Sequence, residues 1–194
     1  MAGANMERCS WCGTEDIYVE YHDAEWGVPQ RDSRMLWEML VLEGFQAGLN
    51  WITILKKREN FREAFEGFDP DKIATWGEPQ IEKLLQNPGI IRHRGKIAAT
   101  ITNAQAWQAA EQNGGFDRFI WDYVDHQPIQ NDFQSMSNVP AATDLSTRMS
   151  KDLKKAGFKF CGPTIVYAFM QACGLVNDHM TNCPRHSEVA RLSQ

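Results

Sequence analysis

The stretch KDLKKAGFKFCGPTIVYAFMQACG, Lys151–Gly174, predicts two helices joined by a tight turn. The first is a short basic helix that ends at Gly157. Phe158–Gly162 would form the link, because Pro163 suits the first turn of a following helix, which would end at Gly174. This is a helix-hairpin-helix pattern.

The second helix of this hairpin could bind a phosphate group of DNA. Backbone N–H groups at the start of a helix have no partner within it and point outward. Lys154, Lys155 and Lys159 would flank the phosphate, with Gly162 at the end of the link. The same pattern also fits a plain structural hairpin, so DNA binding needs further support.

The remainder of the chain is also helical in pattern. Asp32 or Ser33 caps a helix that breaks at Gly48, and Asn50 caps another over residues 51–64. Residues 127–143 would be a connection, because they are polar and show no hydrophobic periodicity. No stretch shows the alternation of a strand, so the fold class is all-α.

Length and composition are consistent with one globular domain, or one domain of two lobes. The chain has 194 residues, of which 43% are hydrophobic and 23% charged. We expect residues 1–5 to be an N-terminal extension, 6–186 the domain and 187–194 a C-terminal tail. Without a membrane-length apolar run or a secretory signal, we expect a cytoplasmic monomer with no membrane partner.

Charge is unevenly distributed along the chain. The net charge is −5, which argues against a nucleic-acid partner. However, residues 148–159 contain five basic side chains against one acidic one, and residues 92–96 add a second basic spot. Since the local field matters more than the total, a phosphate-facing surface is as plausible as two solvated helix faces.

Cysteine and histidine gather at the two ends of the sequence. Two thiolates and two imidazoles suit a closed, structural zinc site, which would leave no position for a catalytic water. The spacing does not decide between Cys9 and Cys12. Six residues are candidates for the four positions: Cys9, Cys12, His22, His179, Cys183 and His186.

One carboxylate interrupts the apolar stretch MLVLEGFQAGLNWITIL, residues 39–55. On a helix, Glu43 shares one face with Leu36 and Leu40, so a core-facing stripe would bury it. A buried carboxylate without a partner is costly. Glu43 is therefore either satisfied by backbone N–H groups or used by a site.

Long blocks of the sequence resemble the DNA-3-methyladenine glycosylase I family. MERCSWC, YVEYHDAEWGVP, LEGFQAGLNWITILKKREN, GIIRHRGKI, HQP, GFKFCGPTI and FMQACGLVNDH occur in this order, from Met6 to about Cys183. The resemblance implies a two-lobed helix-hairpin-helix glycosylase fold, with a structural Zn2+ that joins the chain termini. It also implies hydrolytic removal of 3-methyladenine from double-stranded, alkylated DNA.

The resemblance implies roles for individual residues. Glu43 would line the base pocket as the main functional carboxylate, and Tyr21 would hydrogen-bond the flipped base. Asp178 would orient a zinc ligand rather than catalyse. The stacking faces would be Trp51, Trp11, Tyr18 and Trp26, and the zinc ligands Cys9, His22, His179 and Cys183.

The expected reaction is monofunctional: the base leaves as free 3-methyladenine and an abasic site remains. A lyase step is not expected, because no isolated lysine lies in an apolar stretch. Two alternatives remain at this point. One is a non-catalytic DNA-binding or adaptor protein, and the other is a glycosylase of broader purine specificity.

Overall fold

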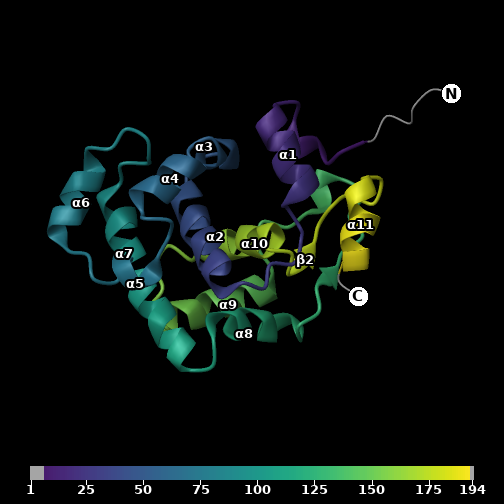
Figure 1. Ribbon diagram of the computed structural model, residues 1–194. Coiled ribbons are helices and arrows are strands. Elements are labelled where there is room, and N and C mark those ends of the chain that lie inside the picture. Colours follow the sequence, from purple (N-terminus) through teal and green to yellow (C-terminus); the bar gives the residue numbers. More distant parts are fainter. Residues whose placement is uncertain (1–6, 193–194) are drawn as a thin grey trace.

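Helix α2 (Ser33–Gln46) crosses the middle of the computed structural model, which describes residues 7–192 (Figure 1). Its N-cap is Asp32, whose carboxylate accepts a hydrogen bond of 2.8 Å from the Met35 N–H. Leu36 and Leu40 are buried on the same face as Glu43, as the periodicity predicts. Helix α2 packs against α7 (Arg94–Gln112) and α10 (Pro163–Ala172).

The prediction of an all-α fold is confirmed, with one minor exception. Strands β1 (Ile129–Gln130) and β2 (Val176–Asn177) form a parallel pair, too short to leave an alternating pattern in the sequence. The other elements are η1 (Ser10–Cys12), α1 (Asp16–Ala24), α3 (Trp51–Leu55), α4 (Arg58–Ala64), α5 (Pro70–Ile73), α6 (Glu78–Leu85), α8 (Phe116–Trp121), η2 (Asp122–Val124), η3 (Met136–Asn138), α9 (Asp144–Lys155) and α11 (Pro184–Leu192).

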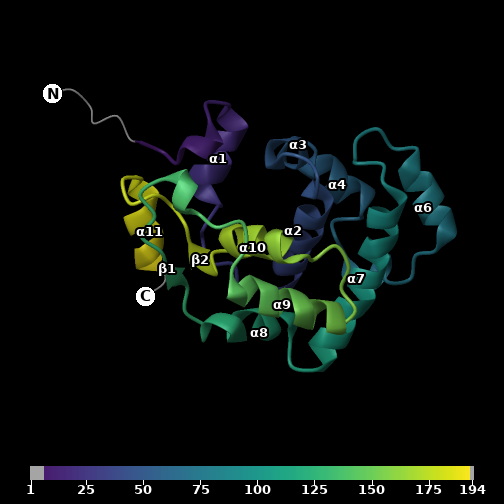
Figure 2. The same ribbon diagram turned by 180° about the vertical axis from the view of Figure 1, so that it is seen from behind.

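The predicted helical hairpin is present as α9 and α10, which lie side by side (Figure 2). Gly157 ends α9 with φ +100°, a conformation that disfavours any side chain. Asn103 of α7 holds the link: its Oδ1 accepts from the Lys159 N–H at 2.7 Å and its Nδ2 donates to the Lys159 carbonyl at 3.2 Å. The link is therefore fixed by a side chain from outside the hairpin.

Two predicted boundaries are wrong. The helix expected over residues 51–64 is divided into α3 and α4, because the Lys57 N–H bonds to the Ile54 carbonyl three residues back and turns the chain. Residues 187–192, expected to be part of a tail, lie in α11, where burial of Val189 holds the helix to the protein. The expected extension at residues 1–5 and residues 193–194 lie outside the described part.

The two described ends of the chain lie close together. Figure 1 shows α1 and α11 at one end of the molecule, with α4–α7 at the other and α2 and α10 between them. Asn182 Nδ2 donates to Glu7 Oε2 at 2.7 Å. Within residues 7–192, no helix is sufficiently long and apolar to span a bilayer.

Candidate active site

A pocket opens between α1, α2, α3 and α10. It contains about 590 Å³ of space not filled by protein, part of it open to solvent. Trp11 is central to one wall, with ring-centroid distances of 5.1 Å to Tyr18 and 4.9 Å to Trp26. All six side chains expected at a base pocket line it: Glu43, Tyr21, Trp51, Trp11, Tyr18 and Trp26.

Three buried polar atoms of the pocket residues lack a hydrogen-bond partner among residues 7–192. They are Glu43 Oε2 and the indole Nε1 atoms of Trp11 and Trp51. Buried polar groups are nearly always paired in folded proteins, so three unpaired ones at one pocket indicate a ligand that supplies the partners. The pocket offers an acceptor, two donors and flat aromatic faces.

Burial controls the protonation of the two deepest polar groups. It raises the pKa of Glu43 to about 8, so the carboxyl is mostly neutral at pH 7 in the free protein. Burial, and then the nearby Glu43, raises the pKa of Tyr21 well above its usual value, so the hydroxyl keeps its proton. A cationic ligand beside Glu43 would favour the ionised carboxylate.

Lys96 is a buried lysine that the sequence did not indicate. Its Nζ donates to the carbonyls of Phe45 at 2.8 Å and Ala47 at 2.7 Å, at the C-terminal end of α2. Burial lowers the pKa of Lys96. Lys96 does not line the pocket. Its ammonium group instead binds carbonyls at the C-terminal end of the helix that carries Glu43, and this contact stabilises that end of the helix.

The structure assigns Asp178 a different position from the expected one. Asp178 does not bond to the His179 ring, whose Nε2 lies 3.0 Å from the Trp26 carbonyl. Instead Asp178 lines the pocket, and its carboxylate accepts hydrogen bonds from Tyr167 at 2.6 Å, Gln171 at 2.8 Å and Asn131 at 2.7 Å. These three hydrogen bonds turn the Asp178 side chain toward the pocket wall, whereas the His179 ring faces Trp26.

Sequence reasoning missed five other pocket residues. Ala168 and Gln171 lie three residues apart on α10, a spacing that could have identified them as one face of that helix. Met136 and Val139 come from the connection that showed no period, so no local signal was available. The five are Gln46, Met136, Val139, Ala168 and Gln171.

A second cluster brings the chain ends together. One ligand atom from each of Cys9, His22, His179 and Cys183 lies within 4.8 Å of the others. Cys9 Sγ is 3.6 Å from His179 Nδ1, and Cys183 Sγ is 3.6 Å from His22 Nε2. A tetrahedral zinc with bonds of ~2.3 Å to sulfur and ~2.0–2.1 Å to nitrogen separates such atoms by roughly 3.6 Å.

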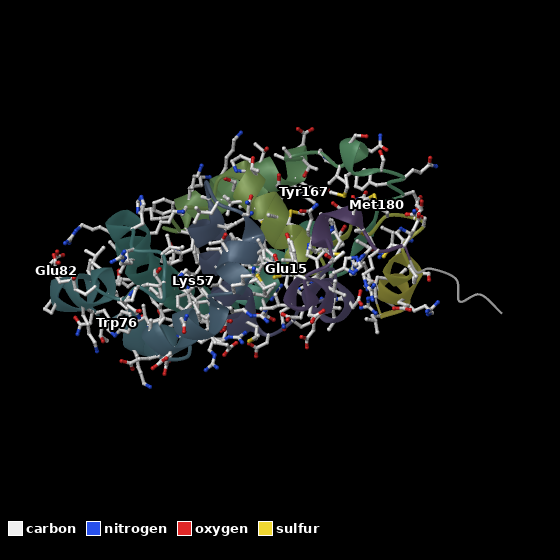
Figure 3. All side chains as sticks on the ribbon, turned by 90° about the horizontal axis from the view of Figure 1, so that it is seen from above. Glu15, Lys57, Trp76, Glu82, Tyr167 and Met180 are labelled. Atoms are coloured by element: carbon white, nitrogen blue, oxygen red, sulfur yellow. The ribbon has the colours of Figure 1, made fainter. Side chains whose placement is uncertain are left out.

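The surroundings of the cluster favour a thiolate at Cys183, whereas the hydrogen bond with Cys183 and burial raise the pKa of the Cys9 thiol. The Met180 N–H donates to Cys9 Sγ at 3.3 Å, and Figure 3 shows Met180 beside the purple N-terminal part of the chain. Hydrogen bonds, chiefly with Cys9, hold the pKa of the Cys183 thiol far below its usual value. His22 Nδ1 lies 2.8 Å from the Asp23 carboxylate, which orients the ring.

The structure separates the other two candidates from this cluster. The Cys12 thiol donates to the Cys9 carbonyl at 3.2 Å, and His186 Nε2 lies 2.9 Å from the Asn131 carbonyl. Cys161 and Cys173 are buried in the core, as expected of small apolar residues. The residues present therefore fit zinc with Cys9, His22, His179 and Cys183.

The hairpin and the pocket share helix α10. Gly162 is its N-cap, and the exposed Lys154, Lys155 and Lys159 lie on α9 and the link before it. Further along the same helix, Ala168 and Gln171 line the pocket. A phosphate at the start of α10 and a ligand in the pocket would thus be held by one rigid element.

The fold and the site define a helical protein with an aromatic pocket for a flat ligand, beside a basic helical hairpin. The profile described as Methyladenine glycosylase matches residues 11–186. The sequence is 56% identical over 179 residues to DNA-3-methyladenine glycosylase 1 of Escherichia coli (strain K12), covering 92% of this chain and 96% of that protein. The chain belongs to the methyladenine glycosylase family, as its motifs indicated.

Two further similarities agree with this membership. Identity is 53% over 178 residues to DNA-3-methyladenine glycosylase of Haemophilus influenzae (strain ATCC 51907 / DSM 11121 / KW20 / Rd), covering 91% and 96% of the two chains. A structure of 3-methyladenine DNA glycosylase I from Staphylococcus aureus superposes with a TM-score of 0.90 at 40% identity. That likeness covers 93% of this chain and 97% of the other.

Proposed function

We propose that this chain removes 3-methyladenine from double-stranded DNA by hydrolysis of the N-glycosidic bond. The unpaired carboxyl of Glu43 at an aromatic pocket is the observation that carries the proposal. The relatives are named for this activity, and the Staphylococcus aureus structure is described as the basis of 3-methyladenine recognition. The products would be free 3-methyladenine and an abasic site, with no lyase step.

Recognition rests on charge and on hydrogen bonding. An enzyme that acts on a base in a duplex must first extrude the nucleotide into a pocket. The methylated adenine is cationic, so it favours aromatic faces and an ionised Glu43 over the neutral carboxyl of the free pocket. Neutral adenine lacks the positive charge, so it gains neither the cation–π interaction with the aromatic faces nor the ion pair with Glu43. This difference distinguishes the damaged base from the normal one.

The reaction needs little acid catalysis from the protein. When the bond between C1′ and the base breaks, its electron pair neutralises the cationic ring, so the base leaves without a proton from the enzyme. The pocket holds the base, and Tyr21 with its retained proton can donate to a ring nitrogen. Lys96 is bonded to backbone carbonyls of α2, away from the pocket, so it is not placed to form a covalent intermediate.

Zinc would have a structural role in this reading. Cys9, His22, His179 and Cys183 supply four ligands, which completes a tetrahedral site. The metal would join the start of the chain, which carries Trp11 and Tyr21, to the segment that carries Asp178. It would thereby hold one wall of the pocket in place.

The direct test is chromatography of bases released from methylated duplex DNA by the zinc-loaded protein. We expect free 3-methyladenine, with one abasic site formed for each base and no strand break before alkali. Tight duplex binding without base release would instead indicate a non-catalytic DNA-binding protein. Inhibition by free 7-methylguanine as strong as that by free 3-methyladenine would indicate broader purine specificity.

The hairpin lysines should contribute to DNA affinity through phosphate contacts. We expect Lys154→Ala/Lys155→Ala to weaken duplex binding at low salt and to lower the slope of log Kobs against log salt by roughly 1.8, because each lost phosphate contact removes ~0.9. Binding measured by fluorescence anisotropy over a salt series gives both values.

The control for this experiment is Lys72→Ala/Lys83→Ala, which removes the same charge from exposed lysines of α5 and α6. Its affinity and salt slope should equal those of the wild type. Equal effects of the two double variants would mean that the hairpin is a structural element without a phosphate site.

A further inference from the structure

Gln171 is a polar pocket residue that the proposed recognition does not use. It lies on α10, three residues after Ala168, and is half-buried at the pocket wall. Its Nε2 donates to Asp178 Oδ2 at 2.8 Å. Its Oε1 accepts no hydrogen bond from the part of the chain that the structure describes.

Asp178 fixes which end of the Gln171 amide faces the pocket. The Gln171 Nε2 group donates to Asp178 Oδ2 at 2.8 Å, so the amide turns its NH₂ group toward this carboxylate and its carbonyl oxygen away from it. Tyr167 and Asn131 donate to the same carboxylate, at 2.6 Å and 2.7 Å, and hold it in place; Tyr167 is marked on α10 in Figure 3. The carbonyl oxygen of Gln171 is then the polar atom left for the pocket.

The depth of the pocket residues indicates where this oxygen lies relative to the nucleotide. Glu43 and Tyr21 are 3% and 2% exposed, so they lie deep in the pocket wall, where the edge of a bound base would meet them. The sugar stays attached to the DNA backbone and must remain near the opening. Gln171 is more exposed than Glu43, Tyr21 or its own partner Asp178, which is 1% exposed, so among these polar residues it is the one that a sugar near the opening would approach.

We propose that Gln171 Oε1 holds the water that attacks C1′, with Asp178 as its positioning residue; this rests on the proposed glycosylase activity. The bond from C1′ to the base breaks and its electrons pass to the base. A lone pair of the water oxygen then forms the new bond to C1′, and the proton of that water passes to bulk solvent. Gln171 accepts a hydrogen bond from the water, which aims the lone pair and stabilises the positive charge that the water develops.

Gln171→Met tests the proposal, because methionine keeps the length of the side chain and removes the acceptor. We expect the single-turnover excision rate to fall about 10- to 100-fold, since positioning of one reactant is lost. The Kd for free 3-methyladenine, from tryptophan fluorescence, should stay within about twofold, because base contacts are unchanged. Gln108→Met is the control. Gln108 lies on the surface of α7, and its replacement removes a similar hydrogen bond of 2.7 Å from its Nε2 to Asp71 of α5.

Asp178→Asn tests the positioning role, because asparagine can donate to Gln171 and turn its NH₂ toward the pocket. Its excision rate should fall as far as that of Gln171→Met, and the double variant should be no slower than either single one. Metal content and circular dichroism must match the wild type. If Gln171→Met does not fold, Gln171→Asn is the second variant. The asparagine side chain is one methylene shorter, which withdraws the amide oxygen from the position of Gln171 Oε1, so the same loss of rate is expected.

Two results would overturn the assignment. Gln171→Met could excise within about twofold of the wild-type rate, which would exclude a water contact. Alternatively, its excision rate and its affinity for free base could fall by equal factors, which would make Gln171 a base contact. Absence of base release by the wild type is a separate result, because it would remove the glycosylase activity itself.

Discussion

Replacement of Glu43 by glutamine should lower excision of 3-methyladenine by at least about 100-fold while raising thermal stability at neutral pH. The carboxyl is 3% exposed, and its Oε2 has no hydrogen-bond partner among the described residues. Glutamine has the same shape but cannot carry the negative charge that favours a cationic base. The stability gain is expected because at neutral pH the unfolded chain gains free energy by ionising this carboxyl, whereas burial keeps it mostly protonated in the folded state.

The pH dependence of stability gives an independent reading of the same side chain. Burial raises the pKa of Glu43 to about 8, above its usual value near 4.5, so between these pH values the folded state binds more protons than the unfolded one. Stability from this group is therefore complete below about pH 4.5 and is lost as the pH rises to about 8. Glu43→Gln should remove this decline, measured by urea unfolding across the range.

Activity should vary in the opposite direction with pH. The cationic substrate pairs with the ionised carboxylate, so wild-type kcat/KM should rise with pH and level off above about 8, the pKa of Glu43 in the free enzyme. The residual activity of Glu43→Gln should lack that rise. An active Glu43→Gln enzyme would reduce Glu43 to a structural carboxyl.

Glu38→Gln is the matched control on the same helix. Glu38 is also buried, at 6% exposure, but its carboxylate bonds to Arg62 Nε at 2.8 Å. Its replacement weakens an ion pair, so stability should not increase at neutral pH, and excision should stay at the wild-type rate. If both variants gained stability equally, the effect could not be assigned to the unpaired carboxyl.

Loss of a zinc ligand should have the second large effect. We expect Cys9→Ala to abolish zinc binding and to lower the Tm by about 10 °C, roughly 3–5 kcal/mol for a chain of this length. Cys9 would no longer tie the start of the chain to His179 and Cys183. Metal analysis and calorimetry measure the two quantities, and a chelator added to the wild type should reproduce the shift.

Cys12→Ala distinguishes a ligand from a neighbouring thiol. Cys12 is equally buried, but its thiol donates to the Cys9 carbonyl and lies outside the cluster. This variant should keep its zinc and most of its stability. Loss of metal from Cys12→Ala would reassign the ligand, and complete metal loss at an unchanged Tm would exclude the structural role.

Local chemistry made several features of this protein predictable. The hairpin followed from Gly157 and from Pro163 at a helix start, because both residues restrict the backbone wherever they occur. Burial of Glu43 followed from its helical spacing to Leu36 and Leu40. The resemblance in the motif blocks added the pocket aromatics. It also added the family, and the comparisons confirm the family.

Other features depended on contacts between distant parts of the chain. Lys96 is buried because it reaches the carbonyls at the end of α2, about fifty positions earlier in the chain, and its own surroundings in the sequence do not show this. Asp178 adjoins a metal-cluster residue in sequence but bonds to Gln171 in the pocket wall. Met136 lines the pocket from a segment with no period at all.

The sequence by itself therefore determined the helical class, the hairpin, the buried carboxylate and the family of this protein. Only the tertiary structure decided which side chains share the pocket, where Asp178 points, and that the four zinc-ligand candidates approach one another while Cys12 turns away. The physical reason is range. Backbone preferences and one-face periodicity act within a few residues, whereas a site is assembled from elements whose relative positions are set by packing of the whole core.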